Sequence, residues 1–137
     1  MKKIVLISCV SKKLEKKSKA KDLYISPLFK YNLRYANSLN PDKIFILSAE
    51  YGLLDLEQEV EPYDKTFNSM KQNEIKAWAE RVLSQLKEVS DINNDKFIFL
   101  AGEKYRKHII QHISDYEIPL KGLGIGRQLK FLKEAVK

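Results

Sequence analysis

The amino-acid sequence predicts a three-layer α/β/α domain with a short, mainly parallel central sheet. Apolar segments of strand length alternate along the chain with segments whose apolar residues recur every three or four positions. Nearly continuous apolar strands between amphipathic helices are typical of a parallel sheet that is covered on both faces. At 137 residues the chain has the length of one domain, so a single α/β domain over 1–137 is expected.

The first two predicted elements are a strand at 2–8 and a helix at 27–39. The segment KKIVLIS is a short apolar run with β-branched residues, as in a buried strand. Before the helix, Ser26 is a candidate N-cap and Pro27 fits the first helical position. Helical periodicity places the following residues on one face: Leu28, Tyr31 or Asn32, and Tyr35.

The later elements continue the alternation of strands and helices. The long helix is defined by apolar residues that recur at three and four from Ile75 to Leu86. The predicted order is a strand at 42–49, a helix at 69–89, a strand at 96–102, a helix at 103–113, a short strand at 118–120 and a helix at 125–136.

Composition excludes several classes of protein and site. No apolar run approaches the roughly 20 residues that a membrane span needs, and the opening lacks a secretion signal, so a cytoplasmic protein without a membrane partner is expected. Cys9 is the one cysteine, and His108 and His112 have no acidic or thiol partner nearby. We therefore predict no metal and no cofactor, and the oligomeric state stays open.

The positive charge of the chain is concentrated at its start. Residues 1–21 hold eight lysines and one acid, and their net charge of +7 equals that of the whole sequence. Such a local cluster favours contact with phosphate backbones, because binding releases counterions. The alternative is a solvated loop whose lysines only aid solubility.

The predicted site lies at the carboxyl ends of the strands. In open α/β sheets ligands bind where the chain passes from strand to helix. Those ends are Cys9–Lys13, Ser48–Tyr51 and Ala101–Tyr105, and we expect them to converge on one rim.

The first strand end and the segment after it supply the basic and hydroxyl candidates. Lys12 could hold a phosphate, or attack an electrophilic carbon if burial lowered its pKa. Cys9 has two interpretations, a small core residue or a substrate contact. Tyr24 and Ser26 precede a helix whose N-terminal amides attract anions, although Ser26 could be only a cap and Tyr24 could only pack on the sheet.

The acidic segment 50–64 contains six carboxylates and no cation. Glu50 and Asp55 are the predicted catalytic acids, alongside Lys12, and Gly52 marks a turn with an unusual backbone angle. The alternative is that these acids hold the lysine-bearing loop. In that case the pairing residues are Glu50, Asp55, Glu61 and Asp64, whereas Glu57 and Glu59 are ordinary exposed positions.

The last motif, GLGIGRQL, places three glycines before the final helix. Such glycines let backbone amides surround a phosphate, and the Arg127 guanidinium can bind the same phosphate. The chain lacks the context of a dinucleotide site, so no nicotinamide is expected. The full set of predicted substrate contacts is Cys9, Ser11, Lys13, Tyr24, Ser26, Ser48, Tyr51, Gly52, Tyr63, Gly102, Tyr105, Gly124, Gly126 and Arg127.

The motifs, in their order along the chain, resemble a known group of proteins. The series SCVSKK, LYISPLF, ILSAEYGLLD with EPYD, FLAGEKY and PLKGLGIGRQLKFL resembles, over nearly the whole chain, a family of small uncharacterised bacterial and phage proteins with a Cys-Ser-Lys-Lys-type opening. The segment LSAEYGLLDLEQEVEPYD is also similar to part of the peroxide-stress protein YaaA family. More distantly, Cys9, Lys12, Tyr24 and Ser26 resemble a motif in the lysine-bearing domain of the archaeosine synthase family.

These groups resemble one another through the uracil-DNA-glycosylase-like α/β fold. The resemblance therefore implies that fold, nucleic-acid binding and a nucleobase handled at the strand-end rim. The chain contains no Asp-Pro-Tyr or His-Pro-Ser motif of the uracil-glycosylase type, so excision of uracil itself is not expected.

The leading expectation is a DNA glycosylase-like enzyme, an N-glycosidic bond hydrolase or base-exchange enzyme, that acts on a base, modified or unmodified, held out of its stack. Its partner is nucleic acid, with DNA preferred over RNA. In this scheme Lys12, Lys13 and Arg127 hold phosphates, Tyr24 or Tyr51 stacks on the base, and Glu50 or Asp55 orients water. Lys12 is the alternative nucleophile. Two other functions stay open, a non-catalytic DNA-binding protein and an enzyme acting on free nucleotides or nucleosides.

Overall fold

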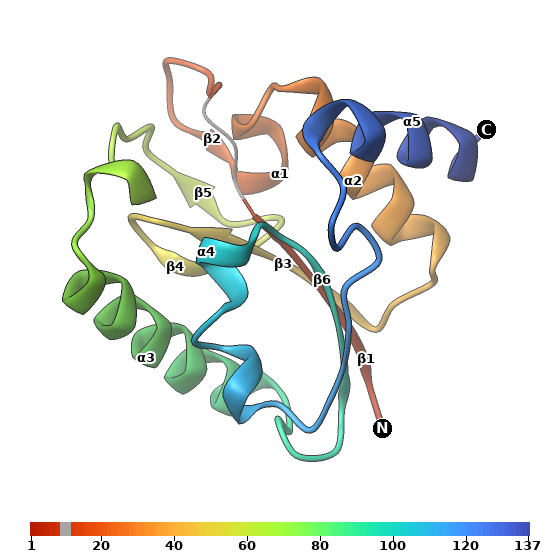
Figure 1. Ribbon diagram of the computed structural model, residues 1–137. Helices are drawn as coiled ribbons and strands as arrows, with labels where there is room; N and C mark the ends of the chain where they lie inside the picture. Colours follow the sequence, from red (N-terminus) through yellow and green to blue (C-terminus); the bar gives the residue numbers. More distant parts are fainter. Residues whose placement is uncertain (9–11) are drawn as a thin grey trace.

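The computed structural model describes residues 1–8 and 12–137, and its centre is a five-stranded sheet of order β4-β3-β1-β6-β7 (Figure 1). One strand, β4 (Gly52–Asp55), runs antiparallel to its neighbour. The other strands run parallel to one another: β1 (Lys3–Ser8), β3 (Lys43–Ser48), β6 (Lys96–Leu100) and β7 (Asp115–Glu117). The predicted mixed α/β class with a mainly parallel central sheet is confirmed.

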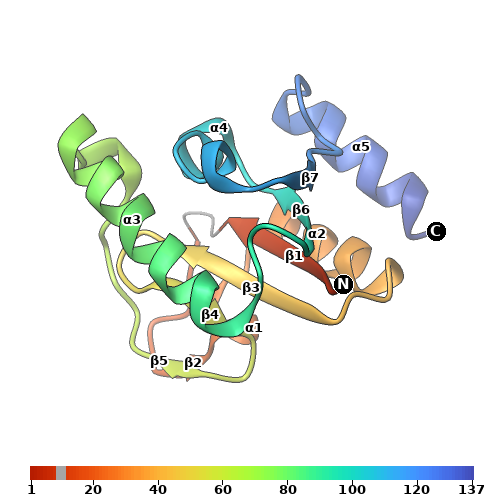
Figure 2. The ribbon, with the colours of Figure 1, turned by 90° about the horizontal axis from the view of Figure 1, so that it is seen from below.

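Helices cover both faces of the sheet. One face is covered by α3 (Gln72–Val89) and by the short α4 (Glu103–Arg106), and the other by α1 (Ala20–Leu23), α2 (Pro27–Ser38) and α5 (Ile125–Ala135). Viewed from below, α3 and α2 lie on opposite sides of β1 and β3 (Figure 2). None of the helices in the described ranges is long and apolar enough to cross a lipid bilayer.

The central strand β1 divides its side chains between the two cores. Ile4 and Leu6 pack into the core under α3, whereas Val5 and Ile7 pack under α2. Successive side chains of a strand point to opposite faces, and all four are fully buried. A strand buried on both faces reads as one unbroken apolar run, which is the pattern that predicted it.

The three long strands and the three long helices lie where the sequence predicts them, and the predicted apolar face of α2 is confirmed in part. The buried residues of α2 are Phe29, Asn32 and Ala36. Leu28 and Tyr35 are only partly buried. Of the two alternatives at the centre of the predicted face, Asn32 is the buried one, and Phe29 and Ala36 are buried beside it.

Several connecting elements also differ from the predictions. The acidic segment forms β4, and β5 (Glu59–Val60) pairs with β2 (Ser18–Lys19) in a second small sheet. The helix predicted at 103–113 is only α4 followed by the 3-10 turn η2 (Ile110–His112), and Ile109 and Ile113, on either side of that turn, are buried in the core. The last strand is β7, three residues before the predicted 118–120.

Candidate functional site

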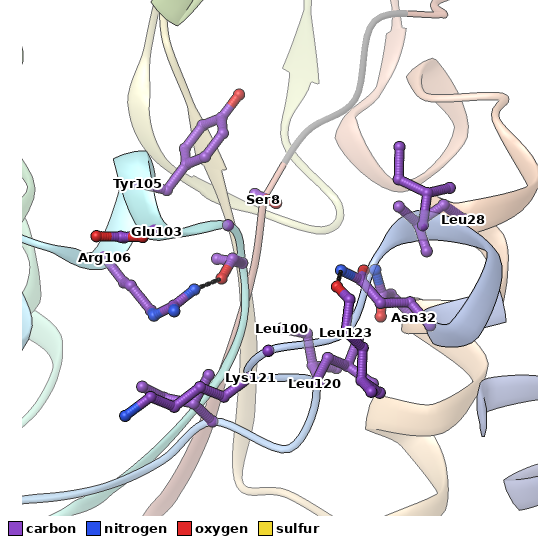
Figure 3. Close-up of a pocket in the computed structure, with 16 residues that line it drawn as sticks. Ser8, Leu28, Asn32, Leu100, Glu103, Tyr105, Arg106, Leu120, Lys121 and Leu123 are labelled. Atoms are coloured by element: carbon purple, nitrogen blue, oxygen red, sulfur yellow. Dashed lines mark hydrogen bonds between the residues drawn. The ribbon is translucent and has the colours of Figure 1, made fainter.

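A cavity of about 380 Å³ opens beside the carboxyl ends of β1 and β6. It lies between α2 on one side and α4 on the other, with the segment before α5 forming a third wall (Figure 3). Much of its wall is aliphatic, with Leu28 from α2, Leu100 from β6 and Leu120 and Leu123 from the segment before α5. A volume within about 300–1,000 Å³ and mainly apolar walls are usual for small-molecule sites.

The cavity contains a buried amide with an unsatisfied oxygen. Asn32 lines the cavity from α2 and is 3% exposed, and within the described residues 1–8 and 12–137 its Oδ1 has no hydrogen-bond partner. Leaving a buried polar atom unpaired costs about 1–3 kcal/mol. Such exceptions in native structures call for an explanation, and a bound ligand with a complementary donor is one. Asn32 is thus the strongest indication that the cavity binds something polar.

Charged groups of both signs surround the mouth of the cavity. Arg106 Nη1 donates to the carbonyl of Ala101 at 2.8 Å, which fixes the guanidinium at the end of β6 (Figure 3). This bond uses one of the five N–H donors of an arginine, so the others can contact a ligand. Lys121 supplies a second cation. Among the described residues that line the cavity, Glu103 is the one carboxylate.

Tyr105 forms an aromatic wall of the same cavity. Its ring stacks on Phe67 with centroids 4.1 Å apart and an interplanar angle of 20°. The indole of Trp78 packs edge-on against both rings, at 4.7 Å from Phe67 and 5.9 Å from Tyr105. Three rings from three segments therefore hold one another in place, and Tyr105 presents a fixed surface to the cavity.

The carboxyl end of β3 carries a chain of hydroxyl groups next to this region. Ser48 Oγ donates to Tyr63 Oη at 2.8 Å, and Tyr63 Oη lies 2.6 Å from Tyr24 Oη. The backbone N–H of Tyr51 donates to Ser48 Oγ at 3.1 Å. Above the chain, Lys13 Nζ lies 4.6 Å from the centre of the Tyr63 ring. These five predicted contacts, which are remote in sequence, meet at one rim.

The turn between β3 and β4 is fastened to α3 by side chains of that helix. Trp78 Nε1 donates to the Ser48 carbonyl at 2.7 Å, and Arg81 Nη2 donates to the Glu50 carbonyl at 2.7 Å. Gly52 has a φ of +76°, and a Cβ there would lie 2.5 Å from Gln85 Oε1. The predicted unusual angle at Gly52 is confirmed, and this positive φ is what favours glycine at the turn, since the close atoms of α3 are the ends of side chains that can shift.

Comparison with protein families gives a match over nearly the whole chain. A model of a family of unknown function, DUF6884, matches residues 4–134, which include every residue that lines the cavity. The chain belongs to DUF6884. A search of curated proteins gave no match. Because the family has no assigned function, the functional argument for this DUF6884 chain comes from the geometry of its site.

The two predicted catalytic acids lie outside the cavity of the DUF6884 chain. Glu50 is exposed, and Arg81 donates a hydrogen bond to its backbone carbonyl. Asp55 pairs with Phe45, because β4 runs back along β3 and carries Asp55 away from the rim. The structure thus separates Asp55 from the carboxyl ends of the parallel strands, and its role as a catalytic acid stays a prediction. Glu103 follows Gly102, the last residue of the strand predicted at 96–102. This position directly after a strand end is the sequence signal that could have identified Glu103.

The remaining predicted site residues of the DUF6884 chain lie at different places relative to the cavity. Gly102 and Tyr105 line the cavity. Gly124 is the N-cap of α5, and Gly126 and Arg127 lie exposed in its first turn, beside the lining residues Ile125 and Gln128. Ser26 acts as the predicted N-cap, since its Oγ accepts from the Phe29 N–H at 3.2 Å, and Lys12 is exposed. Cys9 and Ser11 lie outside the described residues.

The acidic segment does hold part of the lysine-rich segment, but through a residue that was predicted to be an ordinary exposed position. Glu57 pairs with Lys19 at 3.0 Å and with Lys21 at 2.8 Å. The hydrogen bond from Lys21 is the main reason why the pKa of Glu57 is lowered, and Glu57 raises the pKa of Lys21 in return. Among residues 1–8 and 12–137, no group of three or more His, Cys, Asp or Glu side chains is placed to hold a metal ion.

Proposed function

We propose that the protein binds a nucleobase of a nucleic-acid strand in the cavity between α2 and α4, as a member of the glycosylase-like superfamily. The observation that carries this proposal is the buried Asn32 Oδ1, without a partner among the described residues, at a cavity with aliphatic walls. A nucleobase has apolar faces and a polar edge of donors and acceptors, so it complements both features. Tyr105 supplies an aromatic ring at the same cavity.

The charges around the cavity support a nucleic acid as the source of that base. Arg106 and Lys121 line the cavity. Lys12, Lys16 and Lys17 are exposed on the segment that follows β1. Taking a base out of its stack costs a few kcal/mol, and contacts of such cations with the flanking phosphates offset that cost.

The chemistry that fits this arrangement is hydrolysis of the N-glycosidic bond. Water adds to C1′ of the sugar, the bond from C1′ to the base nitrogen breaks, and its electron pair leaves with the base. Glu103, the carboxylate at the cavity, accepts one proton from the water, and a proton is returned to the departing base. In this scheme Glu103 has the role that the sequence suggested for Glu50.

Binding of an oligonucleotide tests the proposal. Fluorescence anisotropy would compare a labelled single strand with the same strand carrying an abasic site analogue. The intact strand should bind at least tenfold more tightly, and Asn32→Leu should remove that difference while Asn37→Leu, on the exposed face of α2, should keep it. Equal binding of both strands by the wild-type protein would contradict a base-binding cavity.

Product analysis separates the enzyme from the other two functions. Release of free base from the strand by the wild type, lost in Glu103→Gln with affinity retained, is expected for the hydrolase. Base-dependent binding without product for any base would indicate a non-catalytic DNA-binding protein. Tight binding of a mononucleotide without affinity for longer strands would indicate an enzyme that acts on free nucleotides or nucleosides.

A further inference from the structure

A second cavity lies on the other side of α4 from the Asn32 cavity. Its volume is about 400 Å³, and it lies between α4 and the segment that joins η1 (Phe67–Ser69) to α3. Phe67, Met70 and Ile75 give it an apolar floor, and Lys104, Lys107 and His108 lie at its margin. It therefore combines an apolar surface large enough for a ring with a cationic border.

The two cavities share a wall. Tyr105 lines the Asn32 cavity and Phe67 lines the second one, and these two rings are stacked 4.1 Å apart. Glu103 lines both cavities. The thickness of two stacked rings thus separates the cavities, and the edge-on contacts of Trp78 keep this wall in place.

The cations of α4 and of the residues just after it are divided between the two cavities. Arg106 lines the Asn32 cavity, whereas Lys104 and Lys107 line the second one. Lys104 Nζ makes a long contact of 3.4 Å with Asn68 Oδ1, so its ammonium group stays at the surface. An anionic chain that crosses α4 from one cavity to the other would meet these cations in turn.

We infer that the second cavity binds the nucleotide next to the one held at Asn32, so that the ligand is a single strand of at least two nucleotides. This inference rests on the proposed function. Neighbouring bases in a duplex stack directly on one another, whereas here a pair of protein rings lies between the two positions. Only an unpaired strand can place adjacent bases on either side of such a wall. The phosphate between them passes over α4, near Lys104 and Arg106.

The test measures the affinity of four ligands for the full-length protein: a deoxynucleoside monophosphate, a dinucleotide, a single-stranded 8-mer and the same 8-mer as a duplex. We expect the dinucleotide and the single strand to bind at least tenfold more tightly than the monophosphate and the duplex. In Lys104→Gln/Lys107→Gln the advantage of the dinucleotide over the monophosphate should fall to less than threefold, with the affinity for the monophosphate unchanged. The matched control, Lys43→Gln/Lys87→Gln, removes two exposed lysines that line neither cavity and should leave this advantage intact.

The outcomes distinguish this inference from the proposed function. If the monophosphate binds in an Asn32-dependent manner but the dinucleotide binds no more tightly, the second position is wrong and the base-binding cavity stands. If the duplex binds as tightly as the single strand, the requirement for an unpaired strand is wrong. If no nucleotide form binds at all, both proposals are overturned.

Discussion

Replacing Asn32 with leucine should make the free protein more stable. The Asn32 oxygen is buried with no hydrogen-bond partner in the part of the chain that the structure describes, which costs about 1–3 kcal/mol, and leucine has a similar size and branches at the same carbon. Its methyl groups would lie beside Leu28, Leu100 and Leu120, which line the same cavity. Leucine also gains roughly 0.5 kcal/mol over asparagine in helix propensity. The expected rise in the free energy of unfolding is therefore about 1.5–3.5 kcal/mol.

Urea unfolding of the wild type, Asn32→Leu and Asn37→Leu measures this gain. Asn37 lies exposed on the same helix, and its replacement measures the propensity contribution together with the loss of the exposed hydrogen bond from Asn37 Nδ2 to the Leu33 carbonyl. After this correction, Asn32→Leu should remain more stable by at least 1 kcal/mol. In thermal unfolding, its midpoint temperature should be higher by about 3 °C per kcal/mol. A corrected free energy of unfolding at or below that of the wild type would refute the view that the unpaired Asn32 oxygen destabilises the free protein and is kept to bind a ligand.

Three other substitutions test the framework of the site. Gly52→Ala should lower the free energy of unfolding by about 1–3 kcal/mol because of its φ of +76° and the close approach of α3, whereas Gly126→Ala in α5, with open space around it, should raise that energy by about 0.5–1 kcal/mol. Trp78→Phe should cost about 1–3 kcal/mol in urea unfolding, since the buried Ser48 carbonyl loses its donor. Backbone N–H groups, chiefly that of Asp91, lower the pKa of Asp95 below its ordinary 3.8, so its stabilisation is complete above about pH 4 and is lost as the pH falls through the lower folded value. In Asp95→Asn the urea midpoint should therefore fall less between pH 6 and pH 3 than in the wild type.

Each of these predictions has a contradicting outcome. Equal stability of both glycine variants would mean that the turn after β3 adapts without strain. An unchanged urea midpoint in Trp78→Phe would mean that water replaces the indole N–H. An identical acid response of Asp95→Asn and the wild type would place the acid sensitivity on other carboxylates.

The sequence predicted the parts of the fold that follow from local pattern. The runs IVLI, IFIL and FIFL are apolar without interruption because β1, β3 and β6 are buried on both faces. Parallel strands then bring Ser48 and Tyr105 to one end of the sheet, although 57 positions separate them in the chain. The meeting of Lys13, Tyr24, Ser48 and Tyr63 follows from this topology.

Other features depend on contacts that no local pattern contains. Gly52 was recognised as a turn, but its angle sends the chain back as β4, which moves Asp55 away from the rim. The sequence offered Asn32 for the buried face of α2, but whether its Oδ1 finds a hydrogen-bond partner there depends on the residues that surround it in three dimensions. Likewise Glu57 becomes an ion-pair partner because β2 and β5 pair over a long sequence distance.

The position of Trp78 makes this residue an intrinsic fluorescence probe of both cavities. It is the one tryptophan of the chain, and its ring touches both the residue that borders the Asn32 cavity and the residue that borders the second cavity. Any molecule that displaces water from Tyr105 or tilts Phe67 alters the surroundings of this indole. Its intrinsic emission can therefore follow occupancy of either position without a dye, and a shift in that emission can screen unlabelled ligands one by one.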